Sequence, residues 1–406
     1  MLEALLLVAS VHAVGLQRQP EFIGPHVAHE SPAVNNDCNF LFNNPALLCY
    51  GVQPSFAVET NSTTLTFFPD ALKLYNSVPT DDSSSDEWVS QAQTFMDLGT
   101  SLIDKNKNQP LYADSALSVK IPLSESNNHG LYLIPYGLGT NTAEILTQDT
   151  SDRVMQNLIA SVGFNQNVEA DVLAQYIATG QVGINVAYGQ YIDFSNMRLR
   201  MGMSIDPMYR WLAEDTFTMN DESHYSILTG HGIGLNEKVG LDVEKKKSNV
   251  RFGIVLNNPY SLFVTTSATQ DVDDVVKPTV IDPDPTSADI GFSYAPDSTL
   301  TLLVNGINVV GYNRATEMWS YNYVPEISAV FKGYHWEGFT TVVVSANEQQ
   351  MTGGVSWKGE KRCDPRIGFN ASVYLMNGDP AYPVGLNFTV DCRERSPKSM
   401  RPLISN

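Results

Sequence analysis

The stretch KVGLDVEKKKSNVRFGIVL, residues 238–256, contains the pattern that decides the fold. Val239, Leu241 and Val243 alternate with small or charged residues, and a polar turn follows at 245–249. The same alternation returns after the turn, at Val250, Phe252, Ile254 and Leu256. A period of two is typical of a β-strand, because successive side chains point to opposite faces. The stretch therefore predicts two antiparallel strands joined by a turn.

The same unit recurs along most of the chain. From about residue 180 onward, alternating blocks of roughly 8 to 11 residues are separated by turn-forming residues. The clearest blocks are Gln181–Ile192, Leu199–Ile205, Ile290–Val304, Ile327–Val344, Ile367–Leu375 and Val384–Val390. A soluble sandwich would turn the apolar set inward, whereas an outer-membrane barrel turns it toward lipid and lines its lumen with the polar set. Alternation alone does not distinguish the two.

Aromatic residues gather near the ends of these blocks. They are Tyr191, Tyr294, Tyr312, Trp336, Trp357 and Tyr382. Such a distribution favours an aromatic girdle at a membrane interface. Ordinary packing at strand ends is the alternative.

The N-terminal half follows a different pattern. Between Asp81 and Lys107 apolar residues recur at intervals of three and four after a Ser/Asp cluster, which predicts a capped amphipathic helix. Two more helices are expected around 151–161 and 168–178, and strands at 116–123 and 130–138. In a barrel, such helices would lie at one mouth.

The composition excludes several classes of protein. The 25 Lys and Arg residues against 44 Asp and Glu give a formal charge of −19, so the basic surface needed by nucleic-acid binders is absent and no nucleic-acid partner is expected. With 43% hydrophobic and 17% charged residues, the chain is too apolar for disorder. No stretch has the length of a helical membrane span.

The N-terminal segment and the cysteines indicate export. Leu2–Val11 is mostly apolar and is followed by the small residue Ala13, so residues 1–13 are predicted to be a signal peptide, with a first strand or helix as the alternative. The four cysteines form two local pairs without zinc or redox spacing. Disulfides are predicted, and free thiols are the alternative. The pairs are Cys38 with Cys49 and Cys363 with Cys392.

Motifs of catalysis and of cofactor binding are absent from the sequence. We find no nucleophile elbow, Walker loop, zinc-protease motif or C-x-x-C pair, so no enzyme, catalytic residue or cofactor is predicted. His26 and His29 have no evident third ligand, and no metal site is predicted. The acidic stretch from Asp271 to Asp289 is interrupted by prolines and is interpreted as a solvated loop. The glycines at 230–234 precede a strand and provide backbone freedom.

The order of several segments resembles a known family. Asn44-Pro45-Ala46-Leu47-Leu48 is similar to the N-P-A-x-L segment that follows the signal peptide in outer-membrane barrels related to long-chain fatty-acid transporters. The chain most closely resembles the conjugal-transfer TraF-like outer-membrane family. The likeness continues through 183–187, 234–243 and 249–259, and covers most of residues 40–390.

The resemblance implies a single antiparallel transmembrane-type β-barrel of roughly 12 to 14 strands, with short helices in the N-terminal half. The expected segments are a signal peptide (1–13), a plug or lead-in (14–50), the barrel (51–392) and a tail (393–406). The implied protein is monomeric, lies in the bilayer of the bacterial outer membrane, and is not an enzyme. It passes or binds a small or hydrophobic ligand, or works with the conjugation machinery.

Two rival interpretations stay open. A secreted all-β adhesin or binding protein would have an apolar core, and an exported hydrolase would need a nucleophile. Within the barrel interpretation, the segment from residue 15 to Leu48 has loop-like composition with several prolines. It is predicted to enter or seal the lumen, and a leader without lumen contact is the alternative.

Overall fold

The computed structural model describes residues 44–47, 52–62, 73, 76–77, 85–106, 111–125, 128–147, 155, 172–218, 224–246, 248–272, 275–281, 284–313, 318–320, 324–344, 348–358, 363–376, 379–381 and 384–393. The predicted signal peptide and, apart from Arg393, the predicted tail lie outside these residues. The domain boundaries and the cleavage of residues 1–13 therefore stay predictions.

The described residues form one antiparallel sheet of 17 strands. Three short strands extend hairpins, namely β8 (Val275–Pro278), β11 (Met318–Ser320) and β16 (Asp379–Ala381). The other 14 strands are β1 (Val52–Ser62), β2 (Leu111–Glu125), β3 (His129–Thr147), β4 (Val172–Asp193), β5 (Met197–Thr218), β6 (His224–Lys245), β7 (Val250–Val272), β9 (Thr286–Tyr294), β10 (Leu300–Asn313), β12 (Val324–Lys332), β13 (Trp336–Val344), β14 (Glu348–Lys358), β15 (Cys363–Met376) and β17 (Val384–Arg393).

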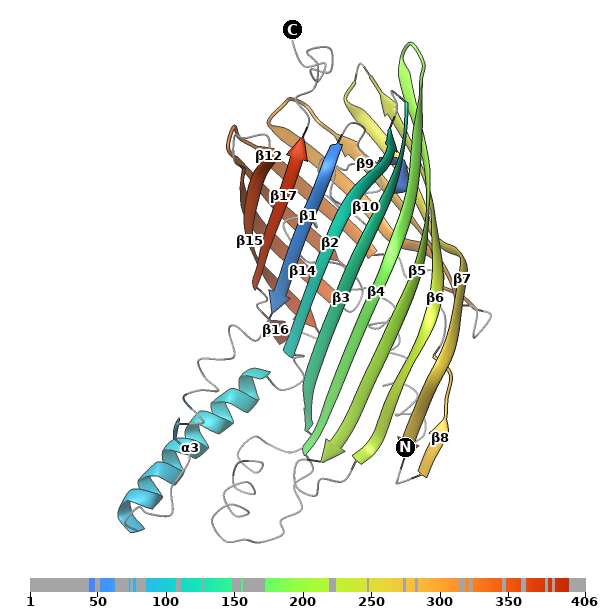
Figure 1. Cartoon of the computed structure of the whole chain (residues 1–406). Helices are drawn as coiled ribbons and strands as arrows, with labels where there is room; N and C mark the ends of the chain where they lie inside the picture. The colour runs from blue at the N-terminus through green and yellow to red at the C-terminus, as the bar shows by residue number, and fades with distance from the viewer. Residues whose placement is uncertain are drawn as a thin grey trace.

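These 14 strands close into a ring. Each pairs with the next strand in chain order, and β17 pairs back onto β1, from Val52 opposite Arg393 to Ser62 opposite Val384. Closure leaves no open edge around the ring, and the strands run obliquely around a barrel (Figure 1). The prediction of a single antiparallel barrel of 12 to 14 strands is confirmed.

The apolar side of the strands faces outward. Phe252, Leu302 and Val342 are 42%, 41% and 39% exposed, whereas their inward neighbours Leu303 and Thr341 are almost completely buried. Many of the buried inward residues are polar, which is the inverse of a soluble sandwich and typical of a membrane barrel. The sandwich alternative is therefore wrong.

The outward apolar band has the height of a membrane. On β5 the outward positions from Met201 to Trp211 carry Met, Ile, Pro, Tyr and Trp. These ten residue steps are roughly 33 Å along the strand and about 25 Å along the membrane normal for a strand tilted by about 40°.

Exposed aromatic residues flank the band, although not all of the predicted ones belong to a girdle. Trp336 and Trp357 are exposed and lie directly opposite each other on β13 and β14. Toward the opposite end of the barrel, Trp211 and Tyr209 lie close together on β5, with 6.3 Å between their ring centroids. Tyr191 instead shares the inner face and lies under the guanidinium of Arg198, 4.9 Å away. Tyr382 is outside the described residues.

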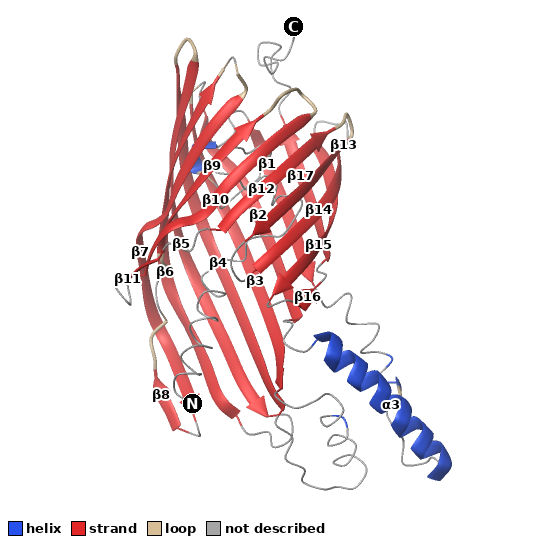
Figure 2. Cartoon of the chain, turned by 180° about the vertical axis from the view of Figure 1, so that it is seen from behind, coloured by secondary structure: helices blue, strands red, loops and turns tan. Residues whose placement is uncertain are grey.

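The two ends of the barrel differ in their connections. Tight turns follow β4, β6, β9 and β12 at the upper end in Figure 1, whereas the links after β1 and β3 at the other end are long. Bacterial barrels place short turns on the periplasmic side and long loops outside the cell. The helix α3 (Ser85–Asn106) lies at the end with the long links (Figure 2).

The predicted helix between Asp81 and Lys107 is confirmed as α3, which buries Ala92 and Phe95. Met155 from the next long link packs where a Cβ on Gly99 would lie. The helix expected at 168–178 is wrong from Val172 onward, because β4 begins there and pairs with both β3 and β5. The helix expected at 151–161 lies outside the described residues except for Met155.

No helix among the described residues is long and apolar enough to cross a membrane.

Candidate functional site: the inner face of the barrel

A row of glycines crosses the inner face of four neighbouring strands. Gly130 on β3 is opposite Gly189 on β4, which is opposite Gly202 on β5, which is opposite Gly240 on β6. Because these four neighbouring glycines have no side chains, another segment of backbone can approach the inner wall of the barrel closely.

The 3₁₀ turn η2 (Pro45–Leu47) packs over two of these glycines, Gly202 and Gly240. The Asn44 side-chain amide donates to the carbonyl of Leu241 at 3.1 Å, and its oxygen accepts from the Ala46 amide at 3.0 Å. A Cβ on Gly202 would lie 2.3 Å from the backbone of Pro45. All residues from Asn44 to Leu47 are buried. Part of the predicted plug thus lies against the inside of the barrel.

Charged residues form an ion-pair network next to η2, toward the tight turns. Arg200 bridges Asp242 and Glu244 on β6, and Arg251 on β7 lies 3.5 Å from Glu244. The network ends at the β4–β5 turn, where Asp193 pairs with Arg198 at 2.7 Å and Lys246 at 3.1 Å. The hydrogen bond from Arg198 holds the pKa of Asp193 below its usual value.

A second network lies on the other side of η2, toward the long links. Arg210 on β5 makes a bidentate pair with Asp284, at 2.8 and 2.7 Å, and donates to the Gln181 side chain at 3.0 Å. Asn236 on β6 also donates to Asp284. Asp284 precedes β9, so this part of the chain folds inward against β5 and β6. The expectation of a solvated loop is wrong for Asp284.

The side chain of Tyr136 extends the second network to β3. Tyr136 donates to Asp206 on β5 at 2.7 Å and accepts from Gln181. A Cβ on Gly183 of β4 would lie 2.6 Å from the Tyr136 hydroxyl, so this glycine allows the ring to cross β4 and reach β5. The three strands are thereby joined inside the barrel.

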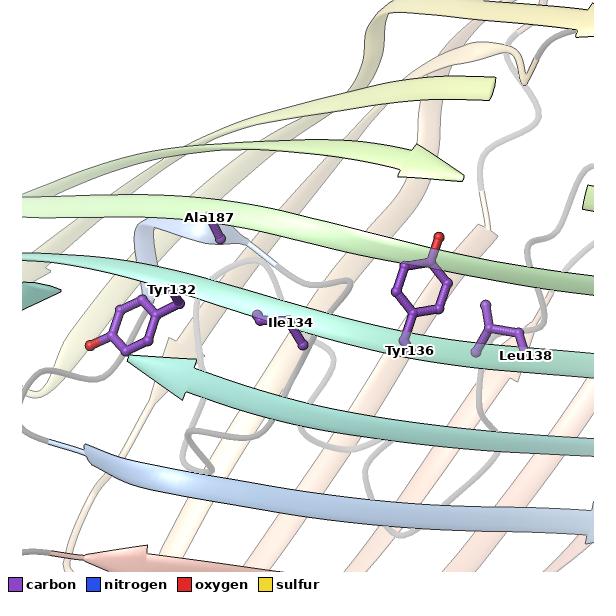
Figure 3. Packing of buried hydrophobic residues seen from close by; sticks show 5 residues of the cluster. All are labelled: Tyr132, Ile134, Tyr136, Leu138 and Ala187. Atoms are coloured by element: carbon purple, nitrogen blue, oxygen red, sulfur yellow. The ribbon is translucent and has the colours of Figure 1, made fainter. Parts of the chain in front are cut away.

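Apolar patches interrupt the polar lining. On β3 and β4 one cluster contains Tyr132, Ile134, Tyr136, Leu138 and Ala187 (Figure 3). A second cluster lies on β10, β12 and β13, across the ring from the first, and contains Leu303, Val330 and Phe339. The inner face therefore offers both hydrogen-bonding and apolar surfaces.

The predicted cysteine pairs are only partly within the described residues. Cys363 on β15 is directly opposite Cys392 on β17. Directly opposite residues in an antiparallel pair have Cα atoms about 4.5 or 5.5 Å apart, which suits a disulfide. The bond itself stays a prediction, and Cys38 and Cys49 lie outside the described residues.

The inward networks were missed by sequence reasoning. The signal that could have found Arg210 is its position among the alternate, inward residues of β5. Nothing local predicts Asp284, because its partner is 74 residues away. Within the described part of the chain, no three potential metal-ligating side chains gather in one place. The arrangement is a lining of paired donors and acceptors in which a few buried acceptor oxygens have no partner.

The closed ring, its outward apolar band and its mixed inner face define a β-barrel of the outer-membrane type. No family model matches the sequence, and no curated protein matches it. Among solved structures, the fold is similar to that of the CymD monoaromatic hydrocarbon channel, with a TM-score of 0.52 and 11% identity over 92% of this chain and 98% of the other.

Two further structures resemble the chain more distantly. The Pseudomonas putida toluene transporter TodX has a TM-score of 0.44 and 10% identity, covering 86% of this chain and 91% of that one. A Pseudomonas aeruginosa FadL homologue has a TM-score of 0.43 and 8% identity, covering 88% and 93%. At these identities the likeness concerns the fold alone.

Proposed function

We propose that the chain is a monomeric, non-enzymatic channel of the bacterial outer membrane that passes small hydrophobic molecules, with its N-terminal segment as the gate. The observation that carries the proposal is the docking of Asn44–Leu47 against the inner glycines Gly202 and Gly240. A segment held there narrows the lumen between the two polar networks, and its release would widen the passage.

The inner face supports a hydrophobic cargo. A purely polar lining favours hydrated solutes, whereas the patches around Ile134 and Leu303 can shield an apolar molecule from water. The similar CymD structure is described as a monoaromatic hydrocarbon channel, which fits a cargo of this class.

The resemblance to conjugal-transfer barrels adds a finer prediction, a conjugation-related role in the cell envelope. It rests on the sequence segments alone. The secreted binding protein is the weaker rival, because Phe252, Leu302 and Val342 would expose a broad apolar band to water.

Transport by the reconstituted full chain tests the proposal. We expect phospholipid vesicles containing the refolded protein to take up toluene faster than protein-free vesicles. We also expect deletion of residues 15–48, which removes the docked Asn44–Leu47, to raise single-channel conductance in planar bilayers. Correctly inserted protein that neither accelerates uptake nor responds to the deletion would contradict the proposal.

A further inference from the structure

Two residues opposite each other on the inner face each have a buried acceptor oxygen without a donor. Asn185 on β4 faces Asp206 on β5, because the register pairs Val186–Ile205 and Gly183–Met208 enclose them. Asn185 is 1% exposed and Asp206 is 6% exposed. The Asn185 Oδ1 and Asp206 Oδ1 atoms are both buried, and neither accepts a hydrogen bond. Leaving such a group without a donor in a protein interior is unfavourable.

Three donors near this pair are used elsewhere. The Tyr136 hydroxyl donates to the other oxygen of Asp206, and the Gln181 amide donates to Tyr136. The Arg210 guanidinium is held by Asp284 and Gln181. The pair is therefore a defined acceptor site beside a network that is otherwise matched.

The surroundings of the pair are mixed: Asn236 on β6 is directly opposite Asp206, and apolar residues lie on the β3 side. Ile134 on β3 is directly opposite Asn185 and belongs to the buried cluster of Figure 3. Ala187 and Met208 occupy the next inward positions on β4 and β5 and are both buried. A molecule with an apolar body and one polar head can satisfy both kinds of surface.

We propose that Asn185 and Asp206 bind the hydrogen-bond-donating head of an apolar ligand, so that the channel prefers hydroxylated hydrophobic molecules to plain hydrocarbons or carboxylates. The inference rests on the proposed function and narrows its substrate class. A hydroxyl donates to the acceptor pair, a methyl group leaves the pair unsatisfied, and a carboxylate is repelled by Asp206.

Three probes that share one ring test this preference. Affinities of phenol, toluene and benzoate are measured by calorimetry on the full chain in detergent. The selectivity is defined as the toluene Kd divided by the phenol Kd. When this ratio is compared between a variant and the unaltered protein, the general difference in hydrophobicity between the two ligands cancels. We expect Asn185→Leu and Asp206→Asn each to lower this ratio, with a fall of roughly tenfold or more when both are combined.

The control variant is Ser356→Ala, on the inner face of β14, and its ratio should equal that of the unaltered protein. If the variants fail to fold, the unaltered protein still decides, because benzoate should bind at least about tenfold more weakly than phenol. An unchanged ratio in the folded variants, or equal binding of phenol and benzoate, would overturn the inference. Toluene uptake that persists in that case would leave the proposed channel function intact.

Discussion

Replacing Gly202 by alanine should release the N-terminal segment from the barrel wall. The added Cβ would lie 2.3 Å from the carbonyl carbon and oxygen of Pro45 and 2.4 Å from the Ala46 nitrogen. These three nearest atoms all belong to η2 and are backbone, so they cannot rotate away. The strain therefore falls on the docked segment and not on the barrel.

The size of the effect follows from this overlap. Inserting one methyl group into a tightly packed contact costs about 1–3 kcal/mol. The hydrogen bond from Asn44 to Leu241 adds about 0.5–1.5 kcal/mol to docking and would be weakened when η2 moves. A shift of about 1–3 kcal/mol changes the ratio of undocked to docked segment by roughly 5- to 150-fold.

Single-channel recording in planar bilayers measures this ratio as the open fraction. We expect both Gly202→Ala and Gly240→Ala to increase it. Gly353→Ala is the matched control, since its Cβ would meet only one atom, at 3.8 Å. If both inner variants insert normally and their open fraction equals that of the control, docking of η2 does not gate the lumen.

Three further predictions concern the disulfide, the buried ion pair and the turn carboxylate. Non-reducing peptide mapping of exported protein should recover Cys363 joined to Cys392, and two free thiols would contradict the pairing. Arg210→Met should lower the free energy of unfolding by about 3–5 kcal/mol, because it removes the cation that pairs with Asp284 and a donor to Gln181. Denaturant titration in vesicles measures this loss, and a loss below about 1 kcal/mol would show that the pair is not buried in practice. Because Arg198 holds the pKa of Asp193 below its usual value, this carboxylate stabilises the fold above the usual pKa of an aspartate, and the contribution is lost as the pH falls through the lowered pKa. Asp193→Asn should therefore flatten the decline in unfolding midpoint below pH 4, and an identical decline in both proteins would refute the assignment.

The barrel strands could be predicted because their signal is local. A period of two at Val239–Val243 and Val250–Leu256 requires no knowledge of the partner strand. Whether the apolar face of the strands points outward or inward could not be predicted in this way, because it depends on whether the sheet closes into a barrel. The pairing of β1 with β17 provides that information, and it joins residues more than 300 positions apart.

The candidate site was less predictable for a related reason. The segment Asn44–Leu47 was expected to lie inside the barrel, but its exact contact depends on Gly202 and Gly240, which come together only in the ladder. Asp284 was assigned to a solvated loop because its neighbours are acidic and its partner Arg210 is distant. The helical spacing at 168–178 misled because pairing on both sides overrides a weak local preference.

The central claim is that the outward band lies in lipid, and an arginine placed within it tests this most directly. Val342 is six residues along β13 from the girdle residue Trp336, which is roughly 15 Å along the membrane normal for a tilted strand. Val342→Arg should lower the free energy of unfolding in phospholipid vesicles by about 2–4 kcal/mol. Tyr334→Arg, in the exposed turn before β13, should change it by less than about 0.5 kcal/mol. Equal, small losses for both variants would place the band in water and contradict the account.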